Sequence, residues 1–204
     1  MQPAGNYYDK YRTRNPVARY LMSGFLSSFD ALLGRTGSPA SALEVGCGEG
    51  ELTIRVARAT SARIRAFDIS SEVVREAEER ISKAGVAERV SLRTDSIYAL
   101  ETARDSADLV VCCEVLEHLD DPETAVAKLA SVCTGHLIAS VPREPLWRAL
   151  NMARGKYWAD LGNTPGHYQH WSTMAFAAML ERHFEIVELR QPLPWSMALC
   201  RPRR

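Results

Sequence analysis

The sequence predicts an α/β fold whose sheet has seven strands and is mostly parallel, on three observations. From Ala42 to Pro142, short apolar or β-branched runs alternate with helical patterns, which is typical of βαβ units. Two further apolar runs near the C-terminus are joined across residues 191–194 and indicate an antiparallel pair at the sheet edge. The 204 residues, with 46% hydrophobic and 25% charged side chains, fit one globular domain with a substantial core.

The alternating region contains five predicted strands, each short and rich in apolar residues. They are Ala42–Gly46, Ile64–Asp68, Val90–Asp95, Ala107–Glu114 and His136–Val141, of which Val90–Asp95 has the weakest pattern. Apolar residues at helical spacing predict three intervening helices, which are Glu51–Thr60, Ser71–Ala84 and Pro122–Val132. Strand and helix therefore take turns, as parallel strands joined by crossover helices require.

The segments outside this region differ in character. Asn15–Leu33 carries one apolar stripe behind an Asn-Pro start, which predicts an amphipathic cap helix. Arg143–Trp171 is rich in aromatic residues and glycines, and we expect an irregular insertion after the fifth strand. The chain then ends in a predicted helix, Ser172–His183, and two strands, Phe184–Leu189 and Trp195–Cys200.

Charge and composition narrow the class of protein. The 25 basic and 25 acidic residues give a formal net charge of zero, which removes the simplest argument for a nucleic-acid partner. The ends of the chain are basic and the middle is acidic, which either helps to hold an anionic substrate or reflects charges scattered over solvated faces. The apolar runs are far shorter than the roughly 20 residues of a membrane span.

The cysteines and the N-terminus predict the compartment. The first residues lack the charged and then apolar pattern of a secretory signal, so we expect a cytoplasmic protein. The five cysteines include no CxxC pair, which argues against a disulfide framework and against a cysteine-rich zinc site. They are therefore expected to be free thiols, and the oligomeric state stays open.

The most informative stretch is a glycine-rich loop that follows the first predicted strand. Gly46, Gly48 and Gly50 alternate between that strand and a helix. Glycine accepts positive φ and has no Cβ, and the N–H groups of a helix start attract a negative group, so such a loop lets backbone approach a ligand. A GxGxxG dinucleotide motif would need glycine at position 51, where Glu51 stands. The spacing therefore does not predict NAD binding.

With Glu44, the loop forms an ExGxGxG pattern, and here the chain resembles the class I S-adenosylmethionine-dependent methyltransferases. The resemblance implies a Rossmann-like fold and S-adenosyl-L-methionine as cofactor. Asp68, which ends the second strand twenty residues after Gly48, would accept both ribose hydroxyls. Asp95 would bind the adenine amino group. Cys47 is expected to be a small packing residue rather than a nucleophile.

The segment after the fourth strand carries a second likeness. Its sequence, EVLEH from Glu114 to His118, is similar to that of the subgroup that includes the ubiquinone-biosynthesis O-methyltransferases. The Tyr-rich start resembles a lid over the cofactor, from which Tyr11, and less so Tyr7, would reach the methionine carboxylate. The cofactor-binding residues that the resemblance implies are Tyr11, Glu44, Gly46, Cys47, Gly48, Gly50, Asp68, Ile69, Asp95, Ser96, Ile97 and Glu114.

This cofactor needs little catalytic machinery, because its sulfonium methyl group is already activated. The protein has to align a nucleophile and, for a hydroxyl acceptor, remove its proton. Histidine suits proton removal near neutral pH, so the candidate bases are His118, His167 and His170. We therefore expect methylation of a small molecule, at a hydroxyl oxygen in the first place and at nitrogen or carbon as the next alternatives.

A metal is not favoured, although one set of residues could hold it. On a helical turn Glu114, Glu117 and His118 would share one face, and such an ExxEH arrangement binds a divalent metal in some relatives. Mg²⁺ there would lower the pKa of a bound hydroxyl. Many members of the family have similar residues at these positions and do not use a metal.

The expected organisation is a single domain over residues 1–204. Residues 1–35 would form a lid and cap helix, 36–142 the cofactor-binding core, 143–171 a substrate-side insertion, and 172–204 the last helix and strand pair. Trp147, Trp158 and Trp171 of the insertion either line the substrate pocket or pack against the sheet edge.

Two other functions stay open. The first is cofactor binding with a non-methylating reaction such as a cyclisation, which the formation of S-adenosylhomocysteine would distinguish. The second is metal-assisted methylation of an RNA 2′-hydroxyl. The absence of surplus positive charge argues against this second function.

Overall fold

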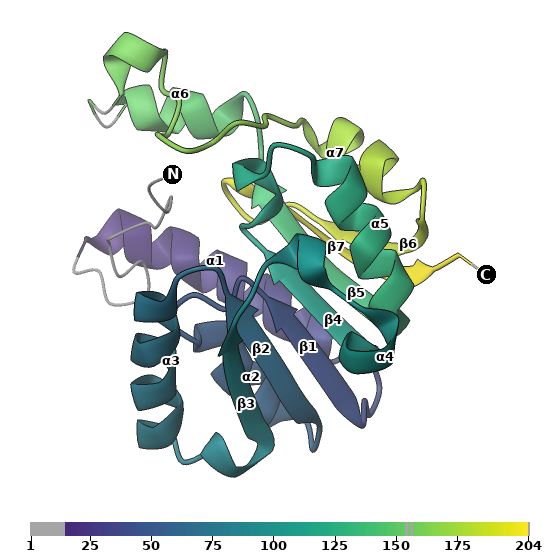
Figure 1. Cartoon of the computed structure of the whole chain (residues 1–204). Helices are drawn as coiled ribbons and strands as arrows, with labels where there is room; N and C mark the ends of the chain where they lie inside the picture. The colour runs from purple at the N-terminus through teal and green to yellow at the C-terminus, as the bar shows by residue number, and fades with distance from the viewer. Residues whose placement is uncertain (1–14, 154, 156, 204) are drawn as a thin grey trace.

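The sheet has seven strands in the order β3-β2-β1-β4-β5-β7-β6 (Figure 1). The computed structural model describes residues 15–153, 155 and 157–203. The strands are β1 Ser41–Val45, β2 Arg63–Asp68, β3 Val90–Thr94, β4 Ala107–Cys113, β5 Cys133–Pro142, β6 Phe184–Arg190 and β7 Trp195–Pro202. The first five strands run parallel, and β7 is antiparallel to both β5 and β6. This confirms the predicted sheet with its antiparallel C-terminal edge.

Helices connect most of these strands, and α1 precedes the first of them. The α-helices are α1 Pro16–Leu33, α2 Glu51–Ala59, α3 Ser71–Lys83, α4 Thr102–Asp105, α5 Pro122–Val132, α6 Leu146–Ala153 and α7 Thr173–Leu180. Short 3₁₀ helices are η1 Ala87–Arg89, η2 Ile97–Ala99, η3 Leu116–His118 and η4 Trp158–Asp160. Polar N-caps start several of the helices: Asn15 Oδ1 accepts from Val17 N at 2.9 Å, and Asp121 Oδ1 accepts from Thr124 N at 3.0 Å.

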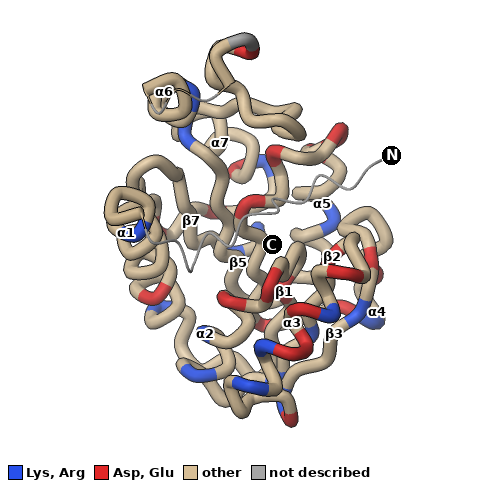
Figure 2. Tube along the Cα trace, turned by 90° about the vertical axis from the view of Figure 1, so that its left-hand side faces the viewer, with Lys and Arg blue, Asp and Glu red and all other residues tan. Residues whose placement is uncertain are grey.

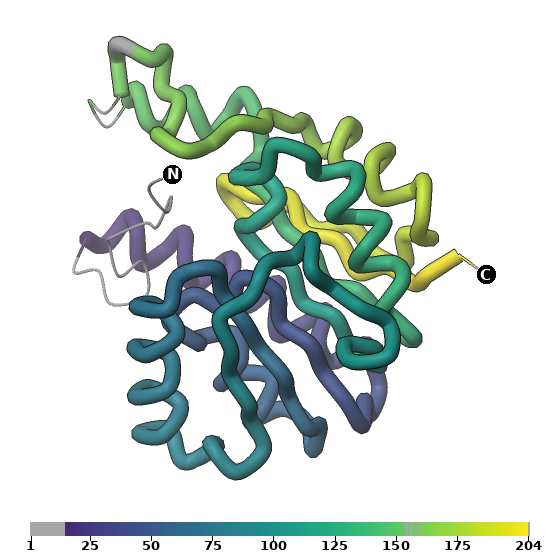
Figure 3. The backbone as a smooth tube through the Cα atoms, viewed as in Figure 1, coloured from purple at the N-terminus to yellow at the C-terminus, as the bar shows by residue number. Residues whose placement is uncertain are grey.

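Helices cover both faces of the sheet (Figure 3). On one face Leu129 of α5 and Phe176 of α7 belong to a buried apolar cluster with alternate residues of β1, β4 and β5. On the other, Phe25 and Phe29 of α1 pack with α2 and the remaining residues of these strands. This is the layering that a parallel sheet needs, because its central strands are buried on both sides.

The structure corrects two details of the predicted elements. The insertion is less irregular than expected, since it contains α6 and η4. Strand β5 begins three residues before its predicted start and runs through Gly135, where a Cβ would lie 2.4 Å from the Asp108 carbonyl oxygen. The close approach of β4 explains why the strand continues through a residue of low strand propensity.

The topology defines one edge where loops converge. After β1 the chain moves outward to β2 and β3 and then returns to β4 on the other side of β1. The loops after β1 and β4 therefore diverge at a switch point at the carboxyl edge, the usual place for a ligand in open α/β sheets. The glycine-rich loop follows β1 at this point.

Acidic and basic residues lie close together along α3 (Figure 2). Arg80 of α3 pairs with Glu49 of the glycine-rich loop and, at 3.1 Å, with Glu51 of α2. These ion pairs tie the loop to α3. None of the helices in the described part of the chain has the length and apolar character needed to cross a lipid bilayer.

Candidate functional site

Gly46 begins the glycine-rich loop in a conformation that other residues adopt at a cost. Its φ is 69°, and a Cβ would lie 2.3 Å from Val115 Cγ2 in the segment after β4. The N–H groups of Gly46 and Cys47 both donate to Phe67 O at 2.9 Å, which fixes the loop against β2. Glycine is therefore required here by a close approach within the protein.

Gly48 is different, because the space beside it is open. Its φ is 51°, and a Cβ would have no protein atom within 4 Å. Gly48 N donates to Asp68 Oδ2 at 3.1 Å, while Oδ1 of the same carboxylate accepts from Ser70 N at 3.1 Å. The structure thus brings Gly48 and Asp68 together beside open space, and Gly50 instead faces Ala77 and Ile81 of α3.

Glu44 lies beneath this loop and is 4% exposed. Its Oε2 accepts a hydrogen bond from the Thr53 hydroxyl of α2. Burial raises the pKa of Glu44 to about 8, and the nearby negative charges of Asp68 and Glu51 add to the rise. The group is therefore mostly uncharged at neutral pH, and its hydrogen bond joins β1 to α2, the two elements on either side of the loop.

This pKa predicts how stability depends on pH. Between about pH 4.5 and about pH 8 the folded chain keeps the Glu44 proton that the unfolded chain releases, so the free energy of unfolding should fall as pH rises, by up to about 1.4 kcal/mol per pH unit from this group. Glu44→Gln cannot ionise and should remove that slope. Urea denaturation of both proteins across this range checks the prediction, and equal slopes would refute it.

Cys47 is buried within the loop, and burial raises the pKa of its thiol well above its ordinary value. A raised pKa makes a thiol a poor nucleophile at neutral pH, since the thiolate is the reactive form. The role of Cys47 as a packing residue stays a prediction, to which its burial is favourable.

Asp95 follows β3 at the same edge and already has several protein partners. Its Oδ2 accepts from Arg93 Nε at 2.8 Å and from Arg104 Nη2 at 3.0 Å, and its Oδ1 accepts from Ser96 N at 2.8 Å. Partial burial opposes ionisation, but the hydrogen bonds from Arg93 and Ser96 outweigh it and lower the pKa of Asp95. The sequence did not indicate either arginine as a partner of Asp95. For Arg104 the reason is that only the fold brings it to this carboxylate.

The two isoleucines marked by the sequence have opposite environments. Ile97 in η2 is buried in the core, whereas the side chain of Ile69, directly after Asp68, is 71% exposed. An exposed apolar side chain beside a carboxylate offers a contact surface to a ring. Tyr7 and Tyr11 lie outside the described residues.

Glu114 does not share a helical face with Glu117 and His118, so that part of the prediction is wrong. Its φ is 60°, and the helical turn η3 begins only at Leu116. The carboxylate turns instead toward the sheet, where Oε1 accepts from Ser140 Oγ at 3.0 Å and Oε2 accepts from Trp195 Nε1 at 2.6 Å. The left-handed conformation breaks the spacing on which the prediction depended.

Glu117 and His118 instead meet His167 of the insertion. One candidate ligand atom from each residue lies within 4.8 Å of the other two. The rings of His118 and His167 stand edge to face with their centroids 4.9 Å apart, and His118 Nδ1 lies 2.8 Å from Gly166 O. We call these three residues the Glu117–His118–His167 cluster; it could share protons or hold a metal ion.

His170 is not part of this cluster. It is exposed, and its Nε2 lies 2.7 Å from Asn163 Oδ1. It lines a separate hollow of about 320 Å³ with Arg148, Asp160 and Leu161. The structure therefore separates one of the three candidate histidines from the other two.

A series of aromatic contacts joins the insertion to the core. The His167 ring stacks on Trp147 of α6 at 5.8 Å, Trp147 contacts Trp195 of β7 at 5.8 Å, and Trp195 contacts Phe25 of α1 at 5.0 Å. Trp171 also packs against the core, but Trp158 is exposed. The tryptophans of the insertion thus have unlike environments.

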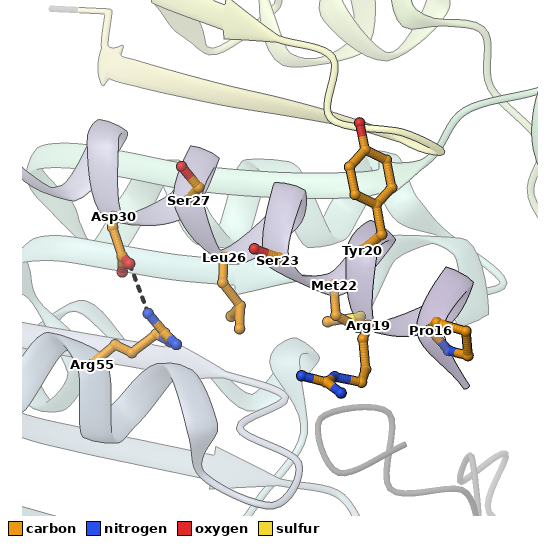
Figure 4. A pocket seen from close by; sticks show the side chains of 9 residues that line it. All are labelled: Pro16, Arg19, Tyr20, Met22, Ser23, Leu26, Ser27, Asp30 and Arg55. Carbon is orange, nitrogen blue, oxygen red and sulfur yellow. Dashed lines mark hydrogen bonds and ion pairs between the residues drawn. The ribbon is translucent and has the colours of Figure 1, made fainter. Parts of the chain in front are cut away.

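An open groove of about 720 Å³ lies between α1 and α2 (Figure 4). Arg19, Tyr20, Met22 and Leu26 line it from α1, and the ion pair between Asp30 and Arg55, at 2.7 Å, closes one end. None of the site residues that the sequence predicted within the described part of the chain lines this groove.

The chain is similar to known methyltransferases. Residues 42–135 match the model of a family described as a methyltransferase domain. The ubiquinone biosynthesis O-methyltransferase of Cupriavidus pinatubonensis is 32% identical over 118 residues, which cover 56% of this chain and 45% of that protein. The matches extend over about half or less of the length of the curated relatives.

Solved structures share the fold at lower identity. The magnesium protoporphyrin IX methyltransferase of Synechocystis PCC 6803 with bound SAH superposes with a TM-score of 0.73 at 21% identity, covering 95% of this chain and 91% of that one. The [4+2]-cyclase SpnF superposes with a TM-score of 0.65 at 15% identity, covering 86% and 81%. At these identities the likeness concerns the fold alone.

Proposed function

We propose that the chain is a class I S-adenosylmethionine-dependent methyltransferase and transfers the methyl group of S-adenosylmethionine to a hydroxyl oxygen of a small molecule, because residues 42–135 match a methyltransferase-domain family and the chain is similar to ubiquinone biosynthesis O-methyltransferases over about half their length. One observation carries the proposal: Gly48 N donates to the Asp68 carboxylate at 3.1 Å beside space that a Cβ could enter. Backbone that can be approached closely and a carboxylate that can accept two hydroxyls are what an adenosyl ligand requires at the carboxyl edge of the sheet.

In this proposal the cofactor lies across the switch point between β1 and β4. Asp68 accepts the ribose hydroxyls, and the exposed side chain of Ile69 contacts the adenine ring together with Ser96. Ile97, whose side chain is buried in the core, supports the Asp95–Ser96 segment from beneath rather than touching the ring. The Asp95 carboxylate, held by its arginine partners, accepts from the adenine amino group. Glu114 lies near the methionine end, where its negative charge favours a cation.

The acceptor side is formed by α1 and by residues 143–171. Two histidines lie on this side. His167 belongs to the insertion, and His118 Nδ1 lies 2.8 Å from Gly166 O of the same segment. We assign the removal of the acceptor proton to the Glu117–His118–His167 cluster rather than to His170, which is hydrogen-bonded elsewhere. The five buried, free cysteines suit the reducing cytoplasm that belongs to this proposal.

Turnover of the cofactor tests this function. The purified chain is incubated with S-adenosylmethionine and a panel of phenols, other alcohols and amines. S-adenosylhomocysteine should accumulate with at least one hydroxyl acceptor and equal the methylated product in amount. A bound cofactor that never yields S-adenosylhomocysteine with any acceptor would contradict methyl transfer.

A non-methylating reaction is the second candidate. It is supported by the fold shared with a [4+2]-cyclase and by the small number of groups that methyl transfer demands. In that case the cofactor would stay intact while a substrate is isomerised. The same incubations, followed by mass spectrometry of the acceptor, distinguish an added methyl group from an unchanged mass.

A further inference from the structure

The Glu117–His118–His167 cluster joins two segments far apart in the sequence. Glu117 and His118 lie in η3 after β4, and His167 lies in the insertion. Ligands about 2.0–2.2 Å from a tetrahedral Zn²⁺ are roughly 3.3–3.6 Å from one another. The three candidate ligand atoms all lie within 4.8 Å of one another, so no separation exceeds the tetrahedral spacing by more than roughly 1.5 Å.

The backbone orients the ring of His118 for a ligand. Its Nδ1 lies 2.8 Å from Gly166 O, and a carbonyl oxygen only accepts, so Nδ1 carries the proton and donates it. The lone pair of the neutral ring is then on Nε2. This is the arrangement by which proteins hold a metal-ligating histidine in one tautomer and one orientation.

The surroundings of the cluster suit a cation. Glu117 is 1% exposed and His167 is 6% exposed, and a nearby positive charge stabilises a buried carboxyl group in its ionised form. The His167 ring is held by its stacking on Trp147. Two hydrogen bonds, from Tyr168 N at 2.9 Å and from Gln169 N at 3.2 Å, join Glu117 O to the insertion and hold the two segments together.

The three candidate metal ligands in the structure differ from the three that the sequence predicted. Glu114, the first residue of the ExxEH pattern, accepts hydrogen bonds from Ser140 and Trp195 and is not in the cluster, whereas His167 is. Exchanging a carboxylate for an imidazole changes the metal that fits. Mg²⁺ prefers oxygen ligands in an octahedron, while two imidazoles and one carboxylate suit ions such as Zn²⁺, Co²⁺ or Fe²⁺.

We propose that Glu117, His118 and His167 bind a divalent transition-metal ion of the Zn²⁺ type in preference to Mg²⁺. Three protein ligands leave a coordination position for water or for an oxygen of another molecule. When bound, such an ion supplies Lewis acidity that lowers the pKa of a coordinated hydroxyl. That use of the ion rests on the proposed methyl transfer, in which it would take the place of proton removal by a metal-free histidine of the cluster, whereas the binding of the ion does not rest on it.

Metal titration of the full chain tests the proposal. The purified protein is stripped with a chelator and titrated with Zn²⁺ and Mg²⁺ by calorimetry, and with Co²⁺ by visible absorption. We expect one Zn²⁺ per chain, bound at least roughly 100-fold more tightly than Mg²⁺, and Co²⁺ bands typical of mixed nitrogen and oxygen ligation. Absence of saturable Zn²⁺ binding, or a preference for Mg²⁺, would overturn it.

Variants locate the site. His167→Ala and Glu117→Gln should each weaken Zn²⁺ binding at least roughly tenfold, because each removes a ligand. The matched controls are His170→Ala, a histidine three residues away in the same insertion, and Glu114→Gln, the excluded carboxylate; both should bind Zn²⁺ as the unaltered chain does. Equal weakening by His170→Ala, or loss of binding in Glu114→Gln, would refute the assignment.

Two further measurements separate the causes of failure. Circular dichroism identifies any variant that has unfolded. Glu117→Gln and His167→Ala change the site independently, so if one of them unfolds, the other still tests whether the site binds Zn²⁺. Binding of S-adenosylhomocysteine is measured on the same stripped samples. If the stripped protein binds S-adenosylhomocysteine but not Zn²⁺, only the proposed metal site is refuted. If it binds Zn²⁺ but not S-adenosylhomocysteine, only the proposed function is refuted.

Discussion

Asp68→Ala is expected to raise the dissociation constant for S-adenosylmethionine by at least roughly 100-fold while the chain stays folded. In the proposed complex the carboxylate accepts two ribose hydroxyls, and hydrogen bonds to a charged group contribute about 1.5–3 kcal/mol each. Within the protein Asp68 also accepts from Gly48 N and Ser70 N, so some loss of stability is expected as well. Isothermal titration calorimetry and thermal unfolding measure the two effects separately.

Asp108→Ala is the matched control for this change. The Asp108 carboxylate also accepts backbone N–H groups, from Ala40 at 2.9 Å and Ser41 at 3.0 Å, but at the start of β4 and therefore at the opposite edge of the sheet. It should lower stability without changing cofactor affinity. Unchanged affinity in Asp68→Ala, or equal losses in both variants, would mean that the ribose is held elsewhere.

Gly48→Ala should also abolish measurable cofactor binding, for a steric reason. A Cβ at this position meets no protein atom within 4 Å, so the folded chain has room for it and the added strain is limited to the positive φ of 51°, about 1–2 kcal/mol. The same methyl group would occupy the space that the proposed cofactor needs. Calorimetry should therefore detect no saturable binding to a protein whose circular dichroism is unchanged.

Two other glycines separate strain from obstruction. Gly85→Ala introduces the same residue at a φ of 72°, also with no atom within 4 Å, in the turn after α3, and should leave affinity unchanged. Gly46→Ala should destabilise the fold itself, because its Cβ would lie 2.3 Å from Val115 Cγ2. If Gly48→Ala bound the cofactor normally, the open space beside it would not be the ligand site.

The sheet and its glycine-rich edge could be predicted from the sequence because their signals are local. Alternating strand and helix patterns determine the order of elements, and the carboxyl ends of parallel strands meet at one edge. That is why Asp68 and the loop from Gly46 to Gly50 were found to be neighbours without a structure. The helix α6 was missed because its eight residues lie among glycines and aromatic side chains that obscure a short helical period.

The surroundings of Glu114 and of the Glu117–His118–His167 cluster could not be predicted to the same degree, because they depend on contacts between distant segments. Trp195 donates to Glu114 from 81 residues away, and nothing around either residue indicates the pair. The positive φ of Glu114 breaks a helical spacing that looked regular in the sequence. His167 joins Glu117 and His118 only because the insertion folds back over the loop that follows β4.

The most direct test is a calorimetric titration of the unaltered chain with S-adenosylhomocysteine, which needs no acceptor and no assumption about the reaction. We expect saturable binding of one molecule per chain, competitive with S-adenosylmethionine. A titration that releases no heat and reaches no saturation with either compound would contradict the assignment of the loop and Asp68 to this ligand.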